Sequence, residues 1–220
     1  MSGELRHVAA SVHGRYLVRP GRRGRPALLG FHGYGESAER QFAELVQIPE
    51  LEGWTLAAVQ ALHPFYDRRS GEVVASWMTK QDRELAIADN LAYVAAVSAA
   101  VRTEHGCGGL AYLGFSQGTA MAYRAAAATR PLLGLIALGG DVPPDVAAQR
   151  RPHLPEVLIG WGERDGWYTA EKLDRDVATL RGHGIEPRVV RLAAGHEWTA
   201  EFRRETGAFL QAQEAAGRRT

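Results

Sequence analysis

Ser116 lies at the centre of the segment Gly114-Phe115-Ser116-Gln117-Gly118, whose residue types and spacing suit an activated serine nucleophile. A serine hydroxyl needs a base to remove its proton, and it must stand clear of the backbone to reach a carbonyl carbon. A tight strand-to-helix turn with the serine at its tip exposes the hydroxyl, and it crowds the positions of Gly114 and Gly118. Backbone N–H groups at the start of the following helix are unpaired, so we expect the N–H of Gln117 to bind a developing oxyanion.

A short glycine–serine pattern also arises by chance in a chain with 25 glycines, in which case Ser116 would be an incidental turn residue. The flanking sequence favours the nucleophile. Residues 110–115 are apolar throughout and predict a buried strand, and the alanine-rich residues 120–128 predict a helix. The pattern therefore occurs at a strand–helix junction near mid-chain, as this turn requires.

A general base and an acid should follow such a serine in the order Ser, Asp or Glu, His. His196 is the only histidine between the last predicted strand and the last predicted helix, and Ala194-Gly195 before it suit a loop. Asp165 and Asp141 each follow a predicted strand, and either could instead be an aspartate that satisfies local turn backbone. We favour Asp165 as the acid because it lies closer along the sheet to the expected histidine loop.

A second oxyanion donor is expected in the loop after the third predicted strand, where His32-Gly33-Tyr34-Gly35 stands. We predict that the N–H of Tyr34 is this donor and that His32 braces the loop through hydrogen bonds. The same segment matches the dinucleotide fingerprint as Gly33-x-Gly35-x-x-Ala38. That interpretation needs a carboxylate near the end of the next strand, which instead ends in residues 60–62, Gln-Ala-Leu, so we expect no cofactor.

The elements that must position these residues alternate between short apolar runs and amphipathic ones, which predicts a mostly parallel sheet covered by helices. The predicted strands are residues 7–12 and 15–18 as an opening hairpin, then 27–31, 54–59, 110–115, 132–138, 156–161 and 187–192. We expect Ser37, Thr169 and Thr199 to begin helices. The stripe Ile87, Leu91, Val94 and Val101 predicts a long helix after a turn-rich stretch at 63–80.

The composition of the 220 residues predicts one domain over 1–220, with 45% hydrophobic and 23% charged residues. A net charge of +1 argues against nucleic acid or an anionic membrane as a partner. We expect a cytoplasmic protein without membrane insertion, because residues 1–10 lack a signal-like apolar core and no apolar run approaches about 20 residues. The single cysteine, Cys107, allows no internal disulfide, and no histidine follows His196-Glu197 at metal-binding spacing, so no metal site is expected.

Together these segments resemble the phospholipase/carboxylesterase family, which includes bacterial carboxylesterases and acyl-protein thioesterases. The resemblance spans nearly the whole chain, through residues 32–36, Trp77, 114–118, Asp165 and 194–196. It implies an α/β-hydrolase fold of about eight strands with an antiparallel start and no large cap domain. It also implies a triad of Ser116, Asp165 and His196, with oxyanion donors at Tyr34 and Gln117. The chain departs from the family at Thr119 and at Gly166-Trp167-Tyr168.

The expected function is a serine carboxylesterase that hydrolyses small to medium acyl esters through an acyl-enzyme on Ser116. The alternatives are an acyl thioesterase or lysophospholipase with the same triad, and a catalytically silent protein that binds a ligand. Four aromatic residues near the predicted site could line an acyl pocket or belong to the core; they are Trp77, Trp167, Tyr168 and Trp198. We predict Trp77 as the substrate contact, and a homodimer stays open.

Overall fold

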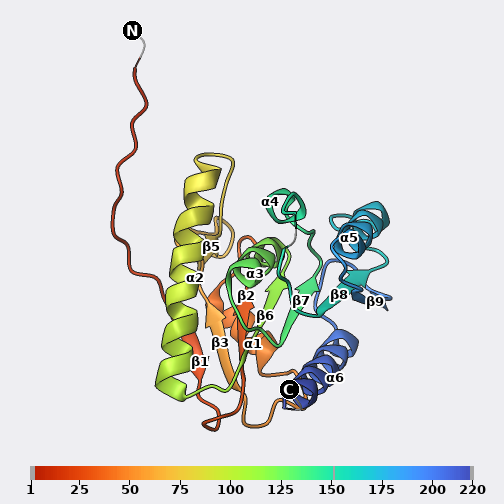
Figure 1. Ribbon diagram of the computed structural model, residues 1–220. Helices are drawn as coiled ribbons and strands as arrows, with labels where there is room; N and C mark the ends of the chain where they lie inside the picture. Colours follow the sequence, from red (N-terminus) through yellow and green to blue (C-terminus); the bar gives the residue numbers. More distant parts are fainter. Residues whose placement is uncertain (1–2, 151, 219–220) are drawn as a thin grey trace.

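A computed structural model describes residues 3–150 and 152–218, which are built around a seven-stranded sheet (Figure 1). Its strands run in the order β1-β3-β2-β6-β7-β8-β9. Only β1 is antiparallel to its neighbour. The strands are β1 (Tyr16–Arg19), β2 (Ala27–Phe31), β3 (Thr55–Val59), β6 (Leu110–Phe115), β7 (Gly134–Leu138), β8 (Val157–Gly162) and β9 (Arg188–Leu192).

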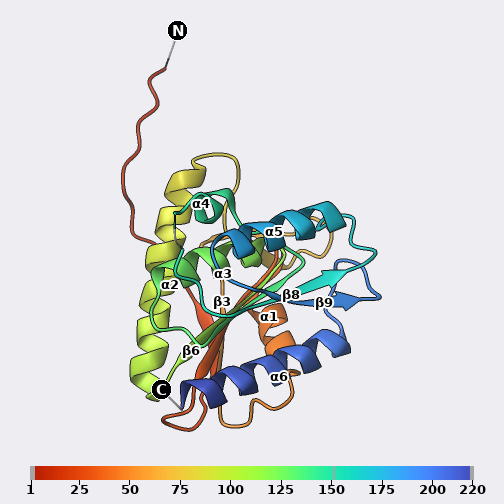
Figure 2. The ribbon, with the colours of Figure 1, turned by 45° about the vertical axis from the view of Figure 1, so that its right-hand side comes forward.

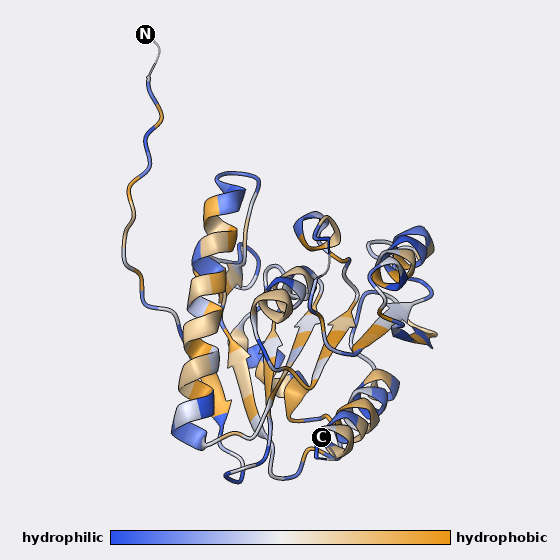
Figure 3. Cartoon of the chain, viewed as in Figure 1, coloured by the Kyte–Doolittle hydropathy of each residue, from blue (hydrophilic) through white to orange (hydrophobic). Residues whose placement is uncertain are grey.

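Helices cover both faces of this sheet, as Figure 2 shows. They are α1 (Ala38–Leu45), α2 (Arg83–His105), α3 (Gln117–Ala128), α4 (Pro144–Ala147), α5 (Ala170–Gly182) and α6 (Ala200–Gly217). One core cluster joins the sheet to α2, α3, α4 and α5, and a second joins it to α1 and α6. The central strands are buried on both sides, so they are apolar along their length, whereas α5 and α6 carry hydrophilic as well as apolar residues (Figure 3).

The predicted α/β-hydrolase architecture is confirmed, and several predicted helix starts are found at the expected residues. Ser37 begins α1 with its side chain accepting from the N–H of Arg40, and Thr199 begins α6 by accepting from the N–H of Phe202. Thr169 begins α5 without a side-chain capping bond. Parallel strands β6, β7 and β8 end at one edge of the sheet, so the loops that follow them meet there.

The predicted opening hairpin is wrong, because residues 3–15 form no strand and only β1 is present. The chain is fixed to α2 at the end of this segment. A Cβ atom on Gly14 would lie 2.2 Å from the Tyr93 ring, and the Tyr93 hydroxyl donates to the carbonyl of Arg15 at 2.6 Å. Residues 3–15 form an exposed segment outside the sheet (Figure 1), and His7 Nε2 lies 2.9 Å from Asp82 Oδ1, just before α2.

The stretch 63–80, predicted as turns, contains a separate antiparallel pair, β4 (His63–Tyr66) and β5 (Val73–Ser76). The main sheet accordingly has seven strands, not about eight. Helix α2 is 23 residues long and apolar enough to span a membrane by length and composition, contrary to the expectation from the sequence. Its buried stripe, which includes Val94 and Val101, packs in the core beside the sheet, as an amphipathic helix of a globular domain does.

Candidate active site

Ser116 occupies a sharp turn between β6 and α3, with φ 53° and ψ −120°. This left-handed φ is costly for a residue with a side chain, and the packed strand and helix on either side hold it in place. A Cβ on Gly114 would lie 2.4 Å from the carbonyl oxygen of Gly118, and one on Gly118 would lie 2.1 Å from that of Phe31. Both glycines are therefore needed for the turn to close.

His196 lies between the serine and an aspartate, in the loop between β9 and α6. Its Nε2 is 2.8 Å from Ser116 Oγ, and its Nδ1 is 2.7 Å from Asp165 Oδ2. The ring also stacks at a tilt on Phe115, with centroids 5.1 Å apart, and Gly139 lies behind it. A Cβ on Gly139 would approach His196 Cε1 to 3.1 Å. The sequence-predicted serine, histidine and aspartate thus form one hydrogen-bonded chain.

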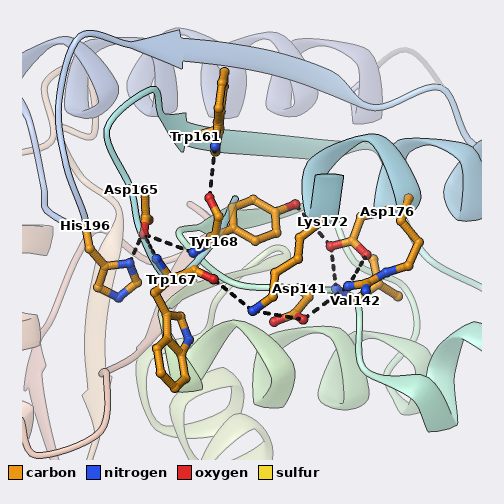
Figure 4. Close-up of polar contacts among 10 residues, drawn as sticks. Asp141, Val142, Trp161, Asp165, Trp167, Tyr168, Lys172, Asp176 and His196 are labelled. Carbon is orange, nitrogen blue, oxygen red and sulfur yellow. Dashed lines mark hydrogen bonds and ion pairs between the residues drawn. The ribbon is translucent and has the colours of Figure 1, made fainter. Parts of the chain in front are cut away.

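Asp165 is held by its own loop as well as by the histidine (Figure 4). Its Oδ1 accepts from the N–H of Trp167 at 2.7 Å and from the N–H of Tyr168 at 2.9 Å, and its side chain is 1% exposed. Asp141, the other candidate, is 40% exposed and pairs with Arg175 at 3.2 Å and Lys172 at 3.8 Å. The structure therefore places Asp165 against His196 and Asp141 away from it.

Asp176 of α5 connects the loops that carry these two aspartates (Figure 4). Its Oδ2 accepts from the N–H of Val142 at 3.0 Å and from the Tyr168 hydroxyl at 3.1 Å. Burial raises the pKa of the Asp176 carboxyl to about 6, although the hydrogen bonds from Val142 and Tyr168 oppose the shift. Asp176 is thus a buried support beneath the site.

The loop after β2 lies against Ser116, since a Cβ on Gly33 would lie 3.3 Å from Ser116 Cβ. Glu36 shapes this loop by accepting from the N–H of Gly33 at 2.8 Å. Among the described residues, no hydrogen bond is found for the backbone N–H of Tyr34 or of Gln117. These are the two donors predicted for an oxyanion.

His32 fixes the base of the same loop, as the sequence predicted. Its Nε2 accepts from the N–H of Ala61 at 3.0 Å, so its Nδ1 carries the proton and donates to the carbonyl of Gly33 at 2.7 Å. Burial lowers the pKa of His32 to about 4, against the smaller opposing effect of the Gly33 hydrogen bond. With both ring nitrogens occupied by backbone, His32 is a neutral structural residue.

The prediction that Trp77 contacts substrate is wrong, because its side chain is completely buried. Its ring lies 5.6 Å from that of Phe31, and its indole N–H donates to the carbonyl of His32 at 2.8 Å. The side-chain amide of Gln117 also binds this segment, accepting from the N–H of Trp77 at 2.9 Å and donating to the carbonyl of Met78 at 2.9 Å. Trp77 therefore supports the nucleophile turn from within the core.

A cleft of about 730 Å³ opens beside Ser116. Its apolar lining includes Met78, Ala120 and Trp167, and the two predicted oxyanion donors, Tyr34 and Gln117, also line it. Trp167 is 66% exposed, whereas Tyr168 is buried. The sequence departs from the family pattern at residues 166–168. Of these, Trp167 thus forms part of the cleft wall, and Tyr168 is a buried support. Trp198 does not line this cleft; it stacks near Phe115 and Phe202.

Sequence reasoning missed the roles of Glu36, Asp176 and the Gln117 amide. A charged residue at helical spacing among apolar ones is a signal for such a buried support. Asp176 has this position on α5, next to Leu173, Val177 and Leu180. Thr119 stood out in the sequence only as a departure from the family. Its side chain is fully buried. The hydroxyl lies 3.1 Å from the carbonyl oxygen of Gly114 and 3.2 Å from that of Leu138. It holds β6 and β7 together beneath the turn.

The loop of Gly33 and Gly35 does not suit a dinucleotide diphosphate. The Glu36 carboxylate takes the N–H of Gly33, one of the donors that a phosphate would need, and adds an acidic group there. In the parts of the chain that the structure describes, no group of three or more histidine, cysteine or acidic side chains is arranged to hold a metal ion.

No protein-family model matches the sequence, and no curated protein sequence matches it. Solved structures do resemble it. Esterase PE8 is 23% identical with a TM-score of 0.73, over 91% of this chain and 99% of that one. SOBER1 from Arabidopsis thaliana is 19% identical with a TM-score of 0.72, over 86% and 99%. Acyl-protein thioesterase 2 from Zea mays is 18% identical with a TM-score of 0.68, over 91% and 99%. The chain has the α/β-hydrolase fold that these proteins share.

Proposed function

We propose that this protein is a serine hydrolase that cleaves carboxylic esters through an acyl-enzyme on Ser116. The observation that carries the proposal is the hydrogen-bonded chain from Ser116 Oγ through His196 to Asp165, with distances of 2.8 Å and 2.7 Å. These contacts have the geometry of a nucleophile, its general base and the acid that orients the base. The fold shared with an esterase and a thioesterase adds support.

In the first half of the proposed reaction, His196 Nε2 takes the proton of Ser116 Oγ as that oxygen bonds to the carbonyl carbon. The electron pair of the C=O π bond moves onto oxygen, which accepts hydrogen bonds from the N–H groups of Tyr34 and Gln117. His196 then gives its proton to the leaving oxygen as the C–O bond breaks. In the second half, water attacks the acyl-enzyme by the same route and releases the acid.

Thioesters are the second candidate substrate class, because the same steps cleave a C–S bond and one structural neighbour is named an acyl-protein thioesterase. The test is a panel of 4-nitrophenyl esters and matched thioesters of increasing acyl length, assayed with wild type and Ser116→Ala. We expect ester turnover by wild type and its loss in the variant by about 10⁵-fold or more. Turnover that survives in Ser116→Ala would overturn the proposal, and a consistently higher kcat/KM for thioesters would move it to that class.

A further inference from the structure

The cleft beside Ser116 carries two basic side chains that the proposed reaction does not use. Lys80 and Arg83 line it together with Ser116 and the apolar residues Met78 and Ala120. Both follow β5, at the start of α2, and both are exposed. Basic groups in a substrate cleft attract and orient anionic substrates, because the low-dielectric walls strengthen the interaction.

Neither basic side chain is held in a hydrogen bond or an ion pair by the described residues of the protein. Within residues 3–150 and 152–218, the side chains of Lys80 and Arg83 form no hydrogen bond and no ion pair. Arg83 interacts electrostatically with Asp145, whose oxygens already accept from Arg124 at 2.7 Å and 2.8 Å. Their donors are therefore available to a substrate.

The one acidic residue that lines the cleft does not cancel these charges. Asp141 already pairs with Arg175 and Lys172, at 3.2 Å and 3.8 Å (Figure 4). Lys172 in turn donates to the carbonyl of Trp167 at 2.8 Å and so holds its charge at the cleft wall. The cleft lining is thus net positive around an apolar floor.

The proposed roles of the residues that line the cleft indicate which part of a substrate enters it. Tyr34 and Gln117, the expected oxyanion donors, line the cleft, whereas His196 does not. His196 must lie next to the leaving oxygen in order to protonate it. On this basis we place the leaving group on the histidine side and the acyl chain in the cleft.

We propose that the preferred substrates are esters whose acyl chain ends in a carboxylate, bound by Lys80 and Arg83. The methylene groups of such a chain contact Met78 and Ala120, and the terminal carboxylate accepts hydrogen bonds from the two basic side chains. This inference rests on the proposed function, since it names the substrate class of the same site.

The test compares two esters of the same leaving group and chain length, the 4-nitrophenyl monoester of glutaric acid and 4-nitrophenyl pentanoate. After subtraction of the uncatalysed rate, we expect wild type to favour the glutarate ester in kcat/KM by about tenfold, the size that two partly exposed charge contacts provide. The preference should shrink in high salt, which screens exposed charges. In Lys80→Gln/Arg83→Gln the ratio should fall to about one.

Arg204→Gln is the matched control, because it removes an exposed positive charge from α6, on the other face of the sheet, and should keep the wild-type ratio. Equal rates for the two esters in wild type would overturn the inference and leave the proposed function intact. Failure of wild type to hydrolyse either ester would overturn both. A second pair of esters, the pentanoyl esters of 4-hydroxybenzoate and 4-hydroxybenzamide, has the same acyl chain. In this pair the negative charge is on the leaving alcohol of the first ester. A stronger preference for the anionic member of that pair would contradict the acyl placement.

Discussion

The loops after β7 and β8 each carry an aspartate at the same edge of the sheet, yet the two side chains lie in opposite surroundings. Asp165 is buried and accepts from two backbone N–H groups and from His196. Asp141 is half-exposed and pairs with flexible basic side chains. A carboxylate that must fix an imidazole needs rigid donors on its other oxygen, which only the Asp165 loop supplies. These backbone donors support Asp165, and not Asp141, as the proposed acid.

Removing the charge from each aspartate in turn should separate their roles by the largest margin. We expect Asp165→Asn to lower kcat for a neutral ester by about 10³–10⁴, because the amide no longer stabilises the imidazolium and favours the wrong tautomer. Asp141→Asn should cost no more than about threefold, since its exposed ion pairs contribute little. Steady-state kinetics on both variants, with thermal unfolding to verify folding, measures the difference. The reverse order of effects would assign the acid role to Asp141.

A smaller effect is expected at Asp176, which supports both loops from below. In Asp176→Asn, the amide oxygen can replace Oδ2 and keep the bonds to Val142 and Tyr168, so the charge is lost while the geometry is kept. The native pKa of Asp176, about 6, lies above its ordinary value of 3.8. The stabilisation linked to this shift is therefore fully present below about pH 4 and is lost as the pH rises through about 6.

The free energy of unfolding of wild type, relative to Asp176→Asn, should accordingly fall between pH 4 and pH 7 by roughly 1–3 kcal/mol. Urea unfolding at several pH values measures it. Asp174→Asn, an exposed aspartate on the same helix, is the control and should show almost no such change. A difference that stays flat with pH, or rises with it, would contradict the burial of an ionisable group between the two loops.

Local patterns in the sequence were sufficient to predict the strand–helix turn at Ser116 and the three residues that the structure joins by hydrogen bonds. Gly114 is required by a contact within the turn itself, and Gly118 by the carbonyl of Phe31 on the neighbouring strand β2. The strand before Ser116 is apolar because both sheet faces are covered. The prediction of Asp165 over Asp141 needed only the order of strands. These features depend on chain neighbours and on the rules of parallel sheets, which a single sequence contains.

Features that depend on contacts between distant segments were not predictable in the same way. Trp77 follows a short strand and precedes a helix, and nothing local shows that its indole reaches the carbonyl of His32, 45 residues away. Residues 7–12 have strand propensity but form no strand, and the chain before β1 instead packs on Tyr93 of α2 at Gly14. Asp176 connects to Val142 across 34 residues of sequence. Each of these cases is a tertiary contact that overrides local preference.

The most direct test of the central claim is covalent labelling with a fluorophosphonate, which reacts with serines activated for attack, followed by peptide mapping. We predict a single labelled residue, Ser116, with no labelling in Ser116→Ala and much slower labelling in Asp165→Asn than in Asp141→Asn. A label on another residue, or a wild-type protein that hydrolyses esters while Ser116 stays unmodified, would contradict the assignment of Ser116 as the nucleophile.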